Sequence, residues 1–245
     1  MDSVFESEGA RLAWLINEVE ARASNAIIDG PEPEDLEVFQ VTASWLTRCF
    51  ALAKGLAVLV QEELYAPACV LHRTVWELWI DWRHLLRTED RRLNAAKVLF
   101  NAQLETLRLI DARPARFEDE PVGALRRDLA DFEAQHPEAS AAVREQRHKG
   151  HFHWSGLTYS KIERGFGGDV GIYGPLSWEA HGTVTTLRDV KIEVGDKPAL
   201  FRFGQTEDAY RPDFLLFSAG GVLFHVYNDF ADMWGLRAIE LRNTE

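Results

Sequence analysis

The chain has 245 residues, of which 46% are hydrophobic and 27% are charged, an ordinary balance for a folded globular protein. This length suits one large domain and is ample to bury a sizeable core. The formal net charge of −12 argues against broad, nonspecific binding to nucleic acids. A negatively charged protein surface and a negatively charged phosphate backbone repel each other within about a Debye length. A local basic pocket remains compatible with it.

The expected compartment is the cytoplasm. Cys49 and Cys69 lie in apolar helical contexts, so we expect both thiols to be reduced and buried. The start of the chain, MDSVFESEGA, is acidic and lacks the pattern of a signal peptide. The apolar stretch from Phe214 to Tyr227 is too short to cross a bilayer. We therefore expect no membrane partner, and apolar helices that can serve self-association in a homodimer.

The first half of the chain predicts four helices from the spacing of its apolar residues. The helices are expected at residues 8–28, 34–64, 67–87 and 90–111. The stretch DGPEPED separates the first two, and Pro67 suits the first turn of the third.

The second half begins with a helix near 121–135, and Pro137 then opens another helix. The stretch RDVKIEVGDKPALFRFG alternates apolar and polar residues on both sides of GDK, which predicts a small β-hairpin near 188–204. Thr206 can cap a last helix over about 207–240.

These elements predict a mainly α fold, a single helical bundle of about seven to eight helices with a small β-hairpin insertion. We expect one domain over residues 1–245. Its segments are an N-terminal helix (1–30), core helices (34–151), a stretch of loop, short helices and hairpin (152–205), and a C-terminal helix (206–241).

A charged stripe follows the helix at 67–87. On a helical wheel Arg73, His84, Glu77 and Asp81 fall within about 80°. A solvated face is one interpretation, since Arg73 and Glu77 form an ordinary i, i+4 pair. A buried, paired stripe is the other, because the remaining sectors hold further bulky residues: Trp76, Trp79 and Ile80.

The stretch RHKGHFHWSG, residues 147–156, gathers three histidines. A zinc site needs three or four ligands at suitable spacing, and His148, His151 and His153 occur with no cysteine pair and no H-E-x-x-H motif. A metal-binding bundle using Glu77, Asp81, His84 and His181 would lack the paired E-x-x-H of di-iron proteins. We therefore expect no metal and no cofactor.

The same stretch carries two arginine–histidine pairs at the spacing of helical ribonucleases of the HEPN class, in which arginine steadies a phosphate and histidine moves a proton. The pairs are Arg144 with His151 and Arg147 with His153. Chance alone supplies roughly two such pairs in a chain of this composition. A structural interpretation competes: Trp154 fills a gap between helices, and Ser155 and Gly156 form a turn, with His148 and His151 in solvent.

A third polar motif follows in YGPLSWEAHG. Ser177 and His181 are four residues apart, on one helix face if Pro175 starts a helix and Gly182 ends it. A G-x-S-x-G elbow is absent from the sequence, which argues against a serine hydrolase. His181 is the residue expected to meet the charged stripe.

Together these motifs resemble a bacterial family of unknown function that shares R-x-x-x-E on an apolar helix, a W-S-G turn and Y-x-x-L-S-x-x-x-H. The matching residues are Arg73 and Glu77; Trp154, Ser155 and Gly156; and Tyr173, Leu176, Ser177 and His181. The resemblance spans roughly residues 45–235. It implies a mostly helical fold and no particular activity, and any relation to HEPN proteins is more distant.

Two functional hypotheses follow. The first is an RNA- or nucleotide-directed enzyme of a defence or toxin type, with Arg73, Glu77 and His181 at its centre and Arg147 or His153 nearby. Its binding residues would be Trp154, Ser155, Ser177 and Asp81. The alternative is a non-catalytic helical interaction or structural module, in which these polar residues form a buried network.

Overall fold

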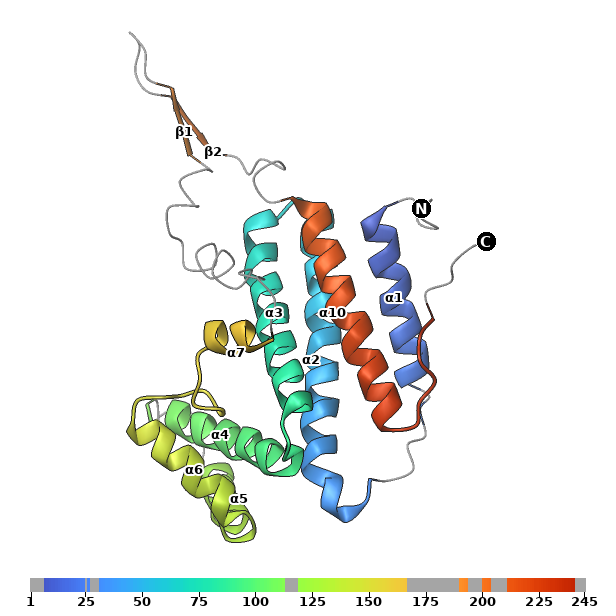
Figure 1. The fold of residues 1–245 in the computed structure, drawn as a ribbon. Helices are drawn as coiled ribbons and strands as arrows, with labels where there is room; N and C mark the ends of the chain where they lie inside the picture. The colour runs from blue at the N-terminus through green and yellow to red at the C-terminus, as the bar shows by residue number, and fades with distance from the viewer. Residues whose placement is uncertain are drawn as a thin grey trace. The chain divides into compact units, whose positions relative to one another are not determined.

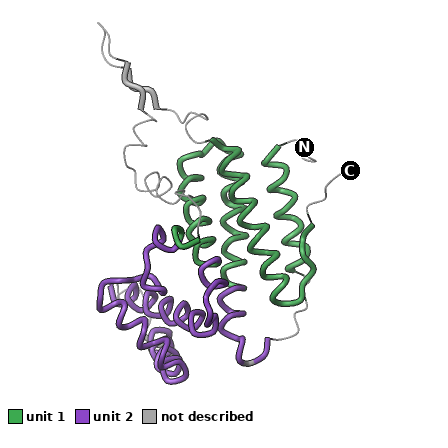
Figure 2. The backbone as a smooth tube through the Cα atoms, viewed as in Figure 1, with its two compact units in different colours: residues 1–29, 43–82, 163–245 green, residues 30–42, 83–162 purple. Residues whose placement is uncertain are grey.

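The computed structural model describes residues 7–24, 26, 31–112, 119–166, 190–193, 200–203 and 211–240 (Figure 1). These residues contain eight α-helices, which confirms the mainly α class. The chain divides into two compact units (Figure 2), and the expected single domain stays a prediction. Unit 1 comprises residues 1–29, 43–82 and 163–245, and unit 2 comprises residues 30–42 and 83–162.

In unit 1, α1 (Glu8–Ala23) packs against α10 (Pro212–Met233), and the two run side by side in Figure 1. The side chain of Ser7 caps α1 by accepting a hydrogen bond from the backbone of Ala10 at 3.2 Å. The buried residues of α1 recur at the spacing of one helix face: Leu12, Leu15, Ile16 and Val19. This apolar periodicity is the pattern from which the sequence predicts a helix here.

Unit 1 also holds most of α2 (Leu36–Gln61) and α3 (Tyr65–Arg87). Trp82 of α3 is fully buried, and its ring centroid lies 6.4 Å from that of Trp45 on α2. Its indole nitrogen donates to a carboxylate oxygen of Asp229 on α10 at 2.9 Å. A buried indole N–H needs such an acceptor, so Trp82 ties α3 to α10.

Unit 2 is built on α4 (Arg91–Asp111), α5 (Asp119–Gln135) and α6 (Pro137–His148). Pro137 opens α6, as the sequence predicts. The structure adds a cap for α4, in which the carboxylate of Asp90 accepts the backbone N–H of Leu93 at 2.8 Å. The short 3₁₀ helix η1 (Pro33–Asp35) is held by Arg92, which pairs with Glu34 and Asp35. The core of the unit comprises Phe100, Leu107, Leu129 and Val143.

The short helix α7 (Tyr159–Gly165) follows the W-S-G turn. Beyond it, β1 (Val190–Glu193) pairs antiparallel with β2 (Leu200–Phe203), with Val190 opposite Phe203 and Glu193 opposite Leu200. The residues between these two strands lie outside the described part of the chain, so the hairpin as a unit stays a prediction.

Several helix boundaries differ from the expected ones. The first helix ends at Ala23 rather than at residue 28, and the second spans Leu36–Gln61 rather than 34–64. The third helix begins at Tyr65 rather than Pro67, so that proline lies within the first turn. The last helix spans Pro212–Met233 instead of 206–241, with Arg211 and not Thr206 at its N-cap. It ends because Gly235 adopts φ +70°, a left-handed conformation that terminates helices. Leu236 and Ile239 continue a helical apolar spacing, but the conformation of Gly235 ends the helix before them.

By length and composition, one described helix, α2, is long and apolar enough to cross a membrane, and 22% of its apolar stretch is buried. The cytoplasmic location stays a prediction. Cys49 and Cys69 are both free and buried, as expected. Burial raises the pKa of the Cys49 thiol to about 12.

His72 of α3 is fully buried without a hydrogen-bonding partner among the described residues for either ring nitrogen. Its nearest ring is that of Phe214 on α10, with the centroids 5.8 Å apart in an edge-on arrangement. Burial lowers the pKa of the imidazole from 6.5 to about 4, because an apolar surrounding disfavours the charged form.

His72 is therefore expected to make unit 1 acid-sensitive. Between pH 6.5 and 4 the unfolded chain binds a proton that the folded chain does not, so the free energy of unfolding falls as the pH drops, by about 3 kcal/mol over that interval. Urea unfolding at pH 7, 6 and 5 measures the loss. His72→Leu removes this contribution and flattens the curve, and parallel curves for the two proteins would contradict the assignment.

Candidate functional site

The charged stripe on α3 is half-buried. The Nε atom of Arg73 donates to Oε1 of Glu77 at 2.9 Å, and their side chains are 17% and 21% exposed. Asp81 and His84, further along the same helix, are also half-buried. The stripe is thus neither a fully solvated face nor a sealed core, and the i, i+4 pair that its spacing predicts is present.

A carboxylate of α7 contacts a second polar side chain of α3. The indole nitrogen of Trp76 donates to Oε1 of Glu163 at 3.0 Å, and Glu163 is only 7% exposed. Trp76 lies three residues, or about one helical turn, after Arg73. The described part of α3 therefore makes two separate polar contacts in unit 1, the Arg73–Glu77 ion pair and the Trp76–Glu163 hydrogen bond.

Sequence reasoning missed Glu163. It lies in a short helix, 87 residues from its partner Trp76, and its neighbours Lys161 and Arg164 are exposed. The one available signal was general: a chain with eight tryptophans needs acceptors for those indoles that are buried.

Arg147, expected near the catalytic centre, is held within unit 2. Its guanidinium donates to Oδ1 of Asn101 at 3.1 and 3.0 Å and forms a short ion pair with Glu105. Asn101 in turn donates to the backbone oxygen of Phe152 at 3.2 Å. Burial raises the pKa of the Glu105 carboxyl, but hydrogen bonds from Arg147 and Arg108 outweigh it, and the net shift is downward. Arg147 thus links α6, α4 and the chain that follows α6.

The W-S-G turn is organised by its own side chains. Nδ1 of His153 lies 2.7 Å from Oγ of Ser155 and accepts the backbone N–H of Ser155 at 3.2 Å. Oγ of Ser155 also accepts the N–H of Leu157 at 3.3 Å. Since Nδ1 accepts a backbone proton, we assign the proton of the neutral imidazole to Nε2. The histidine is fixed, as its position beside Trp154 suggested.

Trp154 packs as a core residue. It is 4% exposed, and its ring centroid lies 5.1 Å from that of His84 and 5.4 Å from that of His153. The ring of His153 also contacts Tyr159, with the centroids 4.9 Å apart. The expectation that Trp154 fills a gap is met within unit 2.

The remaining basic residues of this stretch face solvent. His148 and His151 are exposed, in agreement with their expected position. Arg144 makes a two-pronged ion pair with Glu133, with nitrogen–oxygen distances of 2.8 and 2.7 Å.

The third motif lies outside the described residues. Tyr173, Leu176, Ser177 and His181 belong to the stretch that follows Phe166, the residue just after α7. Within the described ranges, no three histidine, cysteine, aspartate or glutamate side chains are placed to hold a metal ion. His181, which the metal-binding alternative also required, lies outside the described residues, so the expectation of no metal stays a prediction.

A family comparison covers this same region. The sequence model of DUF5677, a family of unknown function, matches residues 39–197, more than half of the chain. The chain belongs to this family. The matched range includes α3, the W-S-G turn, α7 and the stretch with Ser177 and His181, and the resemblance drawn from these motifs is confirmed at the level of an unknown-function family. Neither curated proteins nor solved structures gave a match.

The hydrogen bond between Trp76 and Glu163 is expected to stabilise unit 1. Trp76→Phe keeps an aromatic ring and removes one donor from a buried carboxylate, so the free energy of unfolding should fall by about 1–3 kcal/mol. The same substitution in a Glu163→Leu background should cost clearly less, because the acceptor is already gone. Equal costs in the two backgrounds, measured by urea unfolding, would show that the hydrogen bond contributes nothing.

Gly156 is expected to be hard to replace. Its φ is +72°, and a Cβ atom there would lie 2.9 Å from the side chain of Gln146. Gly156→Ala should lower the free energy of unfolding by about 1–2 kcal/mol or more, since an L-residue is disfavoured in this conformation. Gly165→Ala is the matched control, because a Cβ at Gly165 meets nothing within 4 Å. Similar unfolding midpoints for the two variants would refute this account of the turn.

Proposed function

We propose that this DUF5677 protein is an RNA- or nucleotide-directed enzyme whose centre lies on the face of α3 that carries Arg73 and Glu77. In this proposal Arg73 binds a phosphate, Glu77 orients the guanidinium, and His181 transfers a proton. For an RNA substrate, His181 would take the proton of a 2′-hydroxyl that attacks the adjacent phosphorus. The bond from phosphorus to the 5′-oxygen would break as the 2′-oxygen bonds to phosphorus, leaving a 2′,3′-cyclic phosphate, and the 5′-oxygen would take a proton from solvent water.

The observation that carries the proposal is the half-buried Arg73–Glu77 pair of α3, a helix whose Trp76 also binds the nearly buried Glu163. Taking such groups out of water costs free energy that packed apolar residues would not cost. The hydrogen bond at Nε sets the plane of the guanidinium, and planar, pre-oriented arginine suits phosphate binding.

Chain connectivity supports a role for His181. The chain leaves α7 at Phe166, three residues after Glu163, and His181 follows 15 residues later. At most about 3.5 Å per residue, this connection is long enough to return to α3. A short tether also raises the local concentration of the histidine around the site. Histidine is the usual group for proton transfer near neutral pH.

The test is cleavage of a labelled single-stranded RNA of mixed sequence, together with binding of fluorescent ATP and GTP analogues. His181→Ala and Arg73→Lys should each lower the cleavage rate by about 100-fold or more, with an unchanged circular dichroism spectrum. Arg144→Ala is the control, since this exposed arginine pairs with Glu133 and should leave the rate unchanged. Absence of both cleavage and nucleotide binding in the unmodified chain would reject the proposal.

A second candidate, a non-catalytic helical module, is favoured by the partners of Arg147. This arginine is engaged by Asn101 and Glu105, as a residue that holds helices in register would be. The partner surface would then include apolar groups of α10, such as Phe217, which is 52% exposed, and a second copy of the chain could bind there. Two results together would favour this candidate: the unmodified chain is inactive, and Arg73→Ala unfolds the protein. Unfolding is expected in that case because Glu77 would lose its buried partner.

A further inference from the structure

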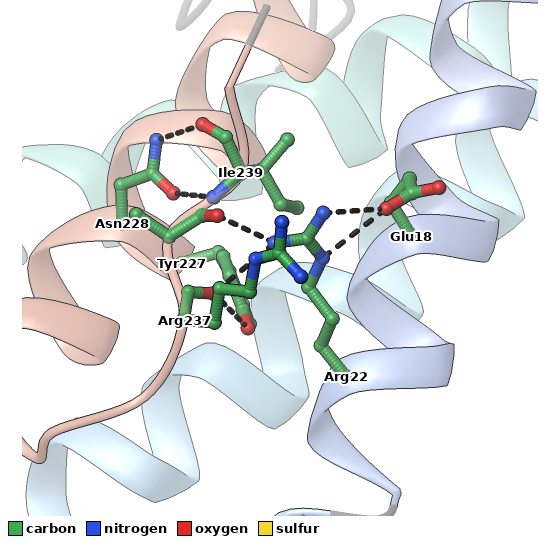
Figure 3. A network of polar contacts seen from close by, with 7 residues as sticks. Glu18, Arg22, Tyr227, Asn228, Arg237 and Ile239 are labelled. Carbon is green, nitrogen blue, oxygen red and sulfur yellow. Dashed lines mark hydrogen bonds and ion pairs between the residues drawn. The ribbon is translucent and has the colours of Figure 1, made fainter.

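The chain that follows α10 turns back beside the helix. Gly235 adopts φ +70°, and the backbone N–H of Leu236 donates to the carbonyl of Ala231 at 2.8 Å. This pattern closes the helix and reverses the chain within one residue. Residues 236–240, here called the tail, then contact side chains of both α1 and α10 in unit 1 (Figure 3). These side chains together are here called the groove.

One wall of the groove is α10, and it contacts the main chain of the tail. The side-chain amide of Asn228 donates to the carbonyl of Ile239 at 3.1 Å and accepts the backbone N–H of Ile239 at 2.8 Å. The hydroxyl of Tyr227 donates to the carbonyl of Arg237 at 3.1 Å. The amide of Asn228 thus pairs with one residue as a neighbouring β-strand would.

The opposite wall is α1, which contributes a fixed arginine. Nη1 of Arg22 donates to the carbonyls of Arg237 and Ala238. Glu18 holds this guanidinium through Nε at 3.1 Å and Nη2 at 2.8 Å. Figure 3 shows Glu18 and Arg22 reaching toward the tail from one side and Asn228 from the other.

One side chain of the tail is recognised by burial. Ile239 is 2% exposed, whereas Arg237, Ala238 and Glu240 are exposed. The groove therefore forms hydrogen bonds to the main chain of three consecutive residues, Arg237 to Ile239, and buries one aliphatic side chain, that of Ile239. Main-chain groups are common to all peptides, so hydrogen bonds to them supply affinity, and the pocket for a single side chain supplies selectivity.

We propose that this groove is a peptide-binding site for an extended segment with one buried aliphatic residue, and that the tail of a second copy of this chain is its occupant in trans. The chain's own tail acts as an internal ligand. The tail of a second copy fits by identity of sequence, and exchange of identical segments is a common route to dimers. The reversal of the chain rests on Gly235, so a change of conformation at that turn redirects the tail.

The balance between the two arrangements follows from the tether. The same hydrogen bonds and the same buried isoleucine form in cis and in trans, so the contacts themselves favour neither. The internal tail has an effective concentration on the order of millimolar or above. Exchange is therefore expected at high protein concentration, or when the internal tail is disabled.

The experiment uses two full-length variants that complement each other. Ile239→Asp leaves an intact groove whose own tail no longer fits, and Asn228→Ala leaves an intact tail whose own groove is damaged. Sedimentation of a mixture should show a one-to-one complex that neither variant forms alone. The control is Ile239→Asp mixed with a double variant, Asn228→Ala with Ile239→Asp, which offers no competent tail and should not associate.

A labelled peptide gives an independent measurement. The acetylated and amidated peptide of residues 236–240 should bind Ile239→Asp at least about tenfold more tightly than the unmodified chain, whose tail competes. A peptide with aspartate in place of isoleucine should not bind. If Ile239→Asp proves unfolded by circular dichroism, Ile239→Ala takes its place. A folded variant that binds neither peptide nor second copy overturns the proposal, and peptide binding without association overturns the second-copy occupant.

Discussion

A polar group that leaves water must find a partner inside the protein, and this requirement organises the helices around α3. Trp82 reaches Asp229 of α10, Trp76 reaches Glu163 of α7, and Arg73 reaches Glu77. Apolar packing brings helices together at many rotations, whereas a hydrogen bond to one carboxylate selects few. The polar residues of α3 thus set which side of the helix meets α10 and which meets α7. His72 is an exception, because its buried ring nitrogens have no such partner among the described residues. Protonation of this imidazole at low pH is therefore expected to destabilise the fold.

Sequence patterns predicted those features that depend on neighbours in the chain. The apolar period of α1, Pro137 at the start of α6 and the Arg73–Glu77 pair all follow from helical spacing. The end of α10 was misplaced, because Leu236 and Ile239 continue a helical period while the conformation of Gly235 overrides it. The Asn228–Ile239 contact and the partners of Arg147 could not be predicted, since they depend on tertiary packing. Trp154 was expected inside because no turn exposes so large a ring without cost.

Charge balance constrains any function that involves an anion. In an acidic chain, Arg73, Arg144 and Arg147 are each paired with a carboxylate: Glu77, Glu133 and Glu105. A phosphate that binds Arg73 would have to share the guanidinium with Glu77. Affinity for a single phosphate is then modest, and base or sugar contacts must add to it. Membership of DUF5677 leaves the choice of ligand open.

The burial of both thiols has a practical consequence for labelling. The chain contains two cysteines, and Cys49 and Cys69 are both enclosed in the helical core. Only the thiolate reacts with maleimides and similar reagents, and the raised pKa of Cys49 keeps its thiol protonated. A cysteine introduced at the exposed Ala238 would therefore be the one reactive thiol of the folded protein. A dye or spin label placed there would follow the tail without removal of either native cysteine.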